Sequence, residues 1–179
     1  VAEIVESSTD PFFSEYIEGS SYNKALEIYN GTGADIDLSA YSLSSCSNGC
    51  NTEGEWDYPD NVTFAAGTIV AAGDVYVVYH QDADADIAQH GDQTFTYLSN
   101  GDDVFAITLA GATASSYTII DIIGEMGDDP GSGWEVAGVA DGTKDHTLVR
   151  KASVTSGNGG DWAMSAGTDA DDAEWIVYD

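Results

Sequence analysis

The sequence predicts an all-β fold in which two sheets pack together as a sandwich. Short runs rich in Val, Ile, Tyr, Phe and Thr recur along the 179 residues, and clusters of Gly, Asn, Asp and Ser separate them. No stretch of comparable strength has the periodicity of a long amphipathic helix. Antiparallel strands at this spacing bury their apolar faces if two sheets pack together or one sheet closes on itself. A sandwich is therefore the leading architecture and a barrel the second.

Nine runs are expected to be strands, and the turn signals between them support the assignment. The first two runs enclose a turn containing Gly, Ser and Asn, and the segments 71–74 (AAGD) and 98–103 (LSNGDD) each place a Gly turn directly before a later run. The length fits one domain spanning residues 1–179. The expected strands are residues 12–18, 25–30, 41–44, 62–64, 75–80, 104–109, 117–123, 147–151 and 175–178.

The charge of the chain excludes several classes of partner. It has 32 acidic and 4 basic side chains, for a formal net charge of -28, and the basic residues Lys24, Lys144, Arg150 and Lys151 are too few for a phosphate-binding surface. Direct binding to nucleic acid or to an anionic membrane is therefore not expected. Since such a surface repels itself unless counter-ions screen it, salt or calcium is expected to stabilise the fold.

No apolar run approaches the roughly 18 to 20 residues that a membrane span requires. The first residue is Val, and no basic and then apolar leader precedes it. The chain is therefore expected to be a processed product or a domain excised from a larger secreted protein.

Two cysteines, Cys46 and Cys50, lie on either side of an Asn-Gly pair that readily forms a tight turn. A disulfide would pin this loop and would favour an oxidising compartment outside the cytoplasm. The alternatives are two free thiols or half of a metal site, although a second Cys or His pair for zinc is absent nearby.

The first two expected strands carry carboxylates in unlike positions. By simple alternation Glu15 shares a face with Phe13 and Ile17, whereas Glu27 faces away from Leu26 and Ile28. An ionised carboxylate on an apolar face needs a partner. Glu15 is therefore either a strand-end residue satisfied by backbone N–H groups or a metal ligand. For Glu15 and Glu27 to share a site, a bulge or a strand end would have to reorient one of them.

Two alternative sets of acids are candidates for calcium binding. The strand set is Glu15, Glu27 and Asp121, although Asp121 is itself expected to point to solvent from the middle of its run. The loop set is Asp82, Asp84 and Asp86, whose spacing matches the first three ligands of a calcium loop. An EF-hand is excluded because Ile87 and Gln93 occupy the positions of its Gly and its bidentate Glu. A solvated acidic loop is the simpler interpretation of the second set.

Several segments together resemble a known family. They are FFSEYIEGSSYNKALEIYNGTG, IDLSAYSL, FAAGTIVAAGDVYVVYH, YLSNGDDVFAITL, DIIG and TLVRK, in this order. The chain resembles the lamin tail domain in its bacterial secreted form, most closely the modules attached to extracellular nucleases and other secreted hydrolases of marine bacteria. The resemblance implies an immunoglobulin-like β-sandwich that serves as an accessory module beside a catalytic domain. It implies no enzyme activity for this segment, and it implies packing roles for Trp162 and Trp175.

The residues themselves offer little for catalysis and one alternative binding function. HExxH and GxSxG are absent, and neighbouring carboxylates are expected by chance among so many acids. The alternative is a calcium-dependent carbohydrate-binding module. In it, exposed Trp56, Tyr58 and Trp134 would stack on sugar rings, and the competing interpretation is that these aromatics pack in small clusters.

Overall fold

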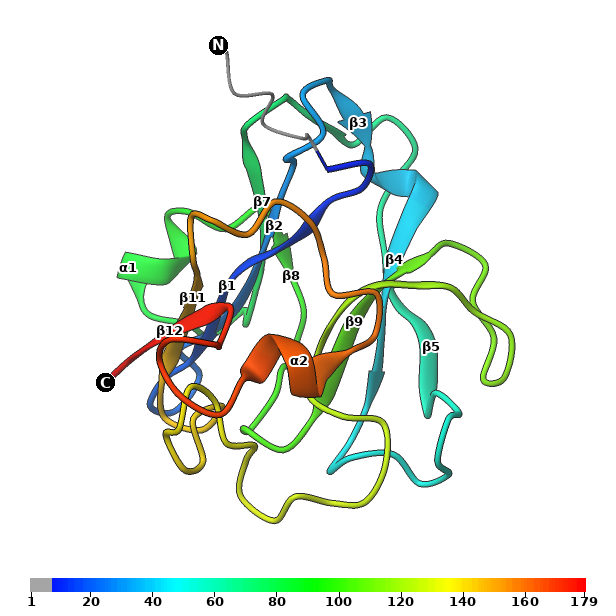
Figure 1. Ribbon diagram of the computed structural model, residues 1–179. Helices are drawn as coiled ribbons and strands as arrows, with labels where there is room; N and C mark the ends of the chain where they lie inside the picture. The colour runs from blue at the N-terminus through cyan, green and yellow to red at the C-terminus, as the bar shows by residue number, and fades with distance from the viewer. Residues whose placement is uncertain (1–7) are drawn as a thin grey trace, which may run out of the picture.

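The computed structural model describes residues 8–179, and most of its regular structure is β-strand (Figure 1). The short helices are η1 (Leu38–Ala40), α1 (Ala85–Ala88) and α2 (Trp162–Ala166). The strands are β1 (Phe12–Glu18), β2 (Lys24–Tyr29), β3 (Ile36–Asp37), β4 (Tyr41–Cys46), β5 (Tyr58–Thr63), β6 (Ile69–Val70), β7 (Val75–Tyr79), β8 (Gln93–Thr94), β9 (Val104–Leu109), β10 (Ile119–Ile123), β11 (Thr147–Arg150) and β12 (Trp175–Tyr178).

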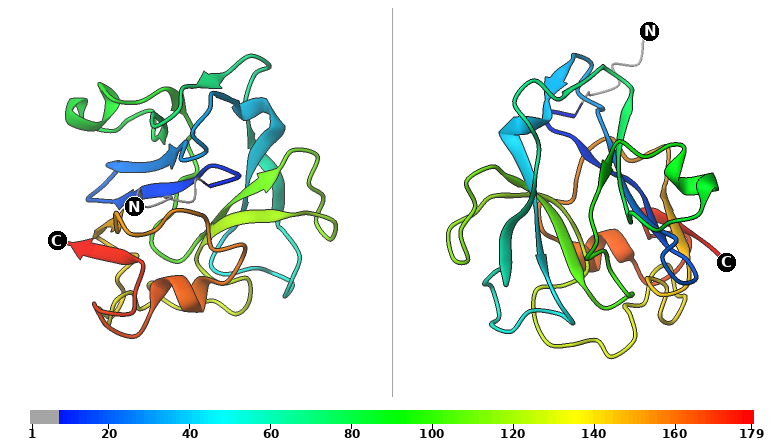
Figure 2. Two further views of the ribbon diagram at one scale, coloured as in Figure 1. Left: turned by 45° about the horizontal axis from the view of Figure 1, so that its top comes forward. Right: turned by 180° about the vertical axis from the view of Figure 1, so that it is seen from behind.

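The strands form two main sheets, which lie on opposite sides of the molecule in Figures 1 and 2. The larger sheet has the order β12-β11-β1-β2-β7-β8, and the smaller has the order β10-β9-β4-β5. Strands β3 and β6 form a separate two-stranded ribbon. Neighbouring strands pair in antiparallel fashion, apart from the parallel pair β7 and β8. This arrangement confirms the predicted all-β, immunoglobulin-like sandwich.

The nine expected strands all coincide with strands of the structure. The least accurate prediction is 62–64, because β5 already begins at Tyr58 and includes Pro59, Asp60 and Asn61, which are residues typical of turns. Asp60 adopts a φ of 48°, and the register between β4 and β5 shifts at this point. The irregular part of the strand therefore carries the sequence signature of a loop.

The core lies between the two sheets. Phe13, Tyr16 and Leu26 of the larger sheet and Leu43 and Phe105 of the smaller belong to one buried apolar cluster. Burial of apolar side chains at an interface between two sheets is the main stabilisation available to such a fold.

The C-terminal segment completes the core. Figure 1 shows α2 across the front of the molecule, between β12 and β9. Asp161 caps α2 by accepting a hydrogen bond from the backbone N–H of Met164 at 3.1 Å. Trp162 and Trp175 are both buried in the common core, which confirms their predicted packing roles.

A bulge in β1 sets which side chains face outwards. The register between β1 and β2 shifts between Phe13 and Glu15. As a result Phe13 and Tyr16 both lie in the core, and Glu15 stands directly opposite Glu27. The expectation that Glu15 shares a face with Phe13 is therefore wrong, because alternation fails across the bulge.

None of the helices in residues 8–179 has the length and the apolar character that crossing a membrane requires.

Candidate functional sites

Asp121 is fully buried and paired with Arg150. Its Oδ1 atom lies 2.7 Å from Nη2 of Arg150 and also accepts the backbone N–H of Asn158 at 2.9 Å, and its Oδ2 atom accepts the backbone N–H of Phe13 at 2.8 Å. The Arg150 guanidinium lies over the ring of Trp175, 4.2 Å from its centroid. The expectation that Asp121 points to solvent is wrong. Its carboxylate joins β10 to β1 and β11 and is separate from the other members of the strand set.

Burial raises the pKa of Asp121 to about 6, although Arg150 and the two backbone N–H groups act in the opposite direction. Desolvation therefore outweighs the favourable contacts. An acid whose pKa is raised in this way depends on its cation partner to remain ionised inside the fold.

Lys24 and Glu18 form a second buried ion pair, at the turn end of the β1–β2 hairpin. The Nζ atom of Lys24 contacts Oε1 of Glu18 and also donates to the carbonyl of Ser99 at 2.7 Å and to Oδ1 of Asn100 at 3.2 Å. Oε2 of Glu18 accepts the backbone N–H of Asp145. The pair thus links the hairpin to two loops from the second half of the chain.

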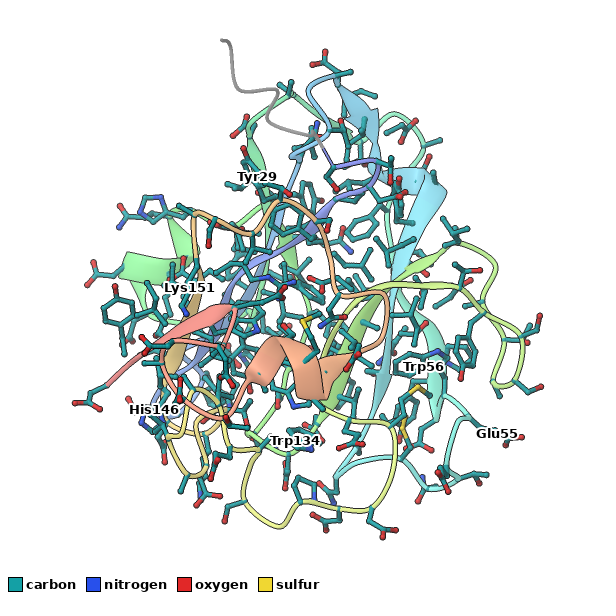
Figure 3. The ribbon with its side chains drawn as sticks, viewed as in Figure 1. Tyr29, Glu55, Trp56, Trp134, His146 and Lys151 are labelled. Atoms are coloured by element: carbon teal, nitrogen blue, oxygen red, sulfur yellow. A yellow bond between two sulfur atoms is a disulfide. The ribbon has the colours of Figure 1, made fainter. Side chains whose placement is uncertain are left out.

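Half of the basic side chains are therefore used inside the protein. Lys24 and Arg150 are buried against Glu18 and Asp121, and the remaining two of the four are Lys144 and Lys151. Figure 3 shows Lys151 on the same side of the molecule as His146, where Nζ of Lys151 donates to the carbonyl of Ala170. The surface consequently carries even fewer cations than the composition indicates.

Glu15, Glu27 and Asp86 line one cavity of about 350 Å³ on the outer face of the larger sheet. Apolar side chains of Ile17 and Val77 also line it. Burial, and then the charge of Glu27, raise the pKa of Glu15. One carboxylate of the loop set and two of the strand set therefore line the same cavity.

The other two members of the loop set point elsewhere. Asp84 is the N-cap position of α1 and accepts a hydrogen bond from Nδ2 of Asn23 at 2.9 Å, and Asp82 is exposed. Within residues 8–179, no three side chains of His, Cys, Asp or Glu are grouped closely enough to hold a metal ion. Neither acidic set forms a ready-made calcium site in this part of the chain.

Replacing Glu15 by Gln is expected to stabilise the protein at neutral pH. A carboxyl whose folded pKa lies above its ordinary 4.5 contributes stability that is complete below pH 4.5 and is lost as the pH rises through the folded pKa. Gln cannot ionise, so the variant should match the wild type near pH 4 and exceed it at pH 7 by up to about 1 kcal/mol, the scale of a like-charged cross-strand pair. Chemical denaturation at the two pH values measures this, with exposed Glu135→Gln as the control. A variant less stable than the wild type at pH 7 would contradict the assignment.

Cys46 and Cys50 are joined by a disulfide with a Cα–Cα distance of 4.9 Å. The bond ties the end of β4 to the loop that follows it. Gly49 within this loop has a φ of 77°, and a Cβ atom there would lie 2.5 Å from the carbonyl oxygen of Gly127. A close approach of the loop to residues 127 and 128 therefore requires Gly at this position.

The three predicted sugar-stacking aromatics do not form one platform. Trp56 is 2% exposed and packs edge-on against Tyr117, so its expected exposure is wrong. Trp134 is half-buried against the core beside Gly124. Figure 3 shows Trp56 and Trp134 well apart. Tyr58 remains, with 49% of its surface exposed.

Two further exposed tyrosines were missed in the sequence. Tyr97 is 77% exposed and Tyr22 is 52% exposed. Tyr97 and Tyr58 line the same cavity, although 39 positions separate them in the sequence. The available signal was weak: Tyr97 stands just before an Asn-Gly turn, and Tyr22 lies inside the turn of the first hairpin.

Comparison with known proteins identifies the family. The family model described as Lamin Tail Domain matches residues 5–122, a range that extends from before β1 into β10. No curated protein and no solved structure matches the chain. Strands β11 and β12 lie beyond the match, yet β11 pairs with β1 in the larger sheet. Since the match covers well over half of the chain, the protein belongs to the lamin tail domain family, a family of non-enzymatic immunoglobulin-like modules.

Proposed function

We propose that this chain is a non-catalytic accessory module of a secreted bacterial protein, with an extracellular nuclease as its parent. The observation that carries the proposal is the use of reactive side chains in structural contacts. Both cysteines form the disulfide, and the buried carboxylates Glu18 and Asp121 are held by Lys24 and Arg150. The family and the resemblance of SEYIEGSSYNKALEIYN to nuclease-associated modules support the same function.

Two of the three histidines, His80 and His146, make structural contacts as well. His80 is buried, stacks on Tyr22 with ring centroids 4.5 Å apart, and accepts the backbone N–H of Asp82 at Nδ1. The ring of His146 contacts the carbonyl of Lys144 through Nδ1. These contacts orient loops, whereas a general base needs a reacting group within hydrogen-bond reach.

Incubation with supercoiled plasmid DNA in magnesium and in calcium tests the absence of nuclease activity. The purified chain is expected to leave the plasmid intact after many hours. Nicking that co-purifies with the folded protein and disappears in an Asp or His variant would overturn the proposal.

The disulfide supports an extracellular location, because such bonds persist in oxidising compartments.

Calcium is proposed as a stabilising ion at the cavity lined by Glu15, Glu27 and Asp86. Three carboxylates with backbone carbonyls and waters can supply the six to eight oxygens that calcium takes, provided that the side chains draw together around the ion. Relief of the repulsion between Glu15 and Glu27 would favour this movement.

Calcium is therefore expected to raise the melting temperature beyond the effect of sodium at equal ionic strength. A ligand at a hundred times its Kd stabilises the folded state by about 2.7 kcal/mol. Glu27→Gln should abolish the difference between the two salts, whereas exposed Asp171→Asn should preserve it. Identical melting curves in the two salts would show that these acids bind no calcium and are only screened by salt.

A further inference from the structure

Exposed tyrosines line two neighbouring cavities at one end of the smaller sheet. Two cavities of about 260 and 280 Å³ adjoin there, and both are lined by Ser47, Tyr97 and Asp103. Tyr58 lines the first cavity and Tyr22 lines the second. We call the combined hollow the tyrosine groove.

Two rings of the tyrosine groove, Tyr97 and Tyr22, pack against other aromatic side chains. Phe95 meets Tyr97 edge-on, with ring centroids 6.0 Å apart. Tyr22 lies flat on His80, with an interplanar angle of 13°. Lys24 holds the loop that carries Tyr97, because its Nζ atom binds Ser99 and Asn100. Tyr97 and Tyr22 are thus positioned before any ligand arrives, which reduces the entropy cost of binding.

Polar side chains between the rings can both donate and accept hydrogen bonds. Nδ2 of Asn61 donates to Oγ of Ser45 at 2.7 Å, so the amide lies at the wall of the first cavity. The carboxylate of Asp103 accepts the backbone N–H groups of Asn48 and Asn100, at 3.0 and 3.3 Å. A carboxylate offers about four acceptor positions, so two remain for hydroxyl donors.

The charge of the groove limits its ligand. Lys24 is the one Lys or Arg among the residues that line the two cavities, and it is already paired with Glu18. Together with the net charge of -28, this disfavours phosphate, sulfate and uronate groups. A polyproline peptide also stacks on aromatic grooves, but its carbonyls only accept hydrogen bonds and cannot pair with the carboxylate of Asp103. Sugar hydroxyls both donate and accept.

We propose that the tyrosine groove binds a neutral oligosaccharide, whose sugar rings stack on Tyr97 and Tyr58 while their hydroxyls bond to Asp103 and Asn61. The inference rests on the proposed role as an accessory interaction module, and it names the class of partner. The site differs from the predicted set of Trp56, Tyr58 and Trp134, of which it retains Tyr58.

Native gel electrophoresis through soluble polysaccharides tests this site, because the strongly anionic chain migrates quickly and its retardation is easily measured. The probes are neutral glucans, mannans and galactans, with alginate and dextran sulfate as anionic comparisons. Retardation is expected in at least one neutral polymer and in neither anionic one. Tyr97→Ala and Tyr58→Ala should each weaken binding about tenfold, the scale for removing an aromatic anchor.

Tyr178→Ala is the matched control. Tyr178 is 51% exposed, which is close to the 49% exposure of Tyr58. Because Tyr178 lies on β12 of the other sheet, its replacement should leave the retardation unchanged. Melting curves show that each variant is folded. Migration unaffected by every neutral polymer, retardation that survives both groove variants, or binding to a polyproline peptide in place of sugar would each overturn the site. Such a result would leave the non-catalytic role standing, since plasmid cleavage tests that role separately.

Discussion

Replacing Arg150 by Met should lower the free energy of unfolding by about 3 to 5 kcal/mol, the usual cost of leaving one partner of a buried ion pair without the other. Met fills much of the same space but leaves the carboxylate of Asp121 inside the fold without its cation. Equilibrium denaturation measures the loss. The neighbouring change Lys151→Met is the matched control, and because Lys151 is part-exposed it should cost less than about 1 kcal/mol.

The loss at Arg150 should depend on pH in a defined direction. Asp121 already has a pKa raised from 3.8 to about 6, and removal of Arg150 should raise it further. Stability from a group with a raised folded pKa is complete below the unfolded pKa and is lost as the pH rises through the folded pKa. The difference between wild type and Arg150→Met should therefore be small near pH 4 and largest near pH 8.

A double variant isolates the pair. Adding Asp121→Asn to Arg150→Met removes the buried charge but keeps an acceptor for the backbone N–H groups of Phe13 and Asn158, so it should restore much of the stability at pH 8. A loss below about 1 kcal/mol in Arg150→Met itself would show that these two N–H groups satisfy Asp121 without a cation.

Replacing Lys24 by Met is expected to lower the free energy of unfolding by a similar amount, about 3 to 5 kcal/mol, because it leaves the buried carboxylate of Glu18 without its cation. Here the effect should also spread to the loop before β9, because Nζ of Lys24 binds the carbonyl of Ser99 and the side chain of Asn100. Amide hydrogen exchange should quicken more at residues 96–103 than in the strands of the smaller sheet.

Lys144→Met serves as the control at an exposed cation, and it should change stability by less than about 0.5 kcal/mol. Adding Glu18→Gln to Lys24→Met should recover part of the loss, since Gln keeps an acceptor for the backbone N–H of Asp145. If amide hydrogen exchange at residues 96–103 were no faster in Lys24→Met than in the wild type, the anchoring role of Lys24 would be contradicted.

The strands could be predicted because each has a local signal. Runs such as 104–109 combine β-branched and aromatic residues with a turn directly before them, and the structure has β9 at these positions. The disulfide could also be proposed locally, since only three residues lie between Cys46 and Cys50 along the chain. Strands β3 and β6 have two residues each, which are too few for a periodic pattern that would predict a strand.

The contacts that decide the sites are long-range, and for that reason the sequence did not reveal them. Asp121 and Arg150 are 29 residues apart, and nothing local to Asp121 indicates a buried partner. The position of Glu15 depends on a bulge that one extra residue creates, which alternation cannot anticipate. The tyrosine groove joins the first hairpin, β5 and the loop before β9, and only the sheet order brings these together.

A gel-shift titration with DNA at low salt tests whether this module, with half of its scarce cations buried, recognises polyanions by itself. Electrostatic binding is strongest at low ionic strength, so a gel-shift titration in about 20 mM salt without divalent ions is the most demanding condition. We expect no shift of a short DNA duplex at any protein concentration in the titration. A clear shift under these conditions would contradict this expectation, whereas a shift that requires calcium would point to bridging between carboxylates and phosphates.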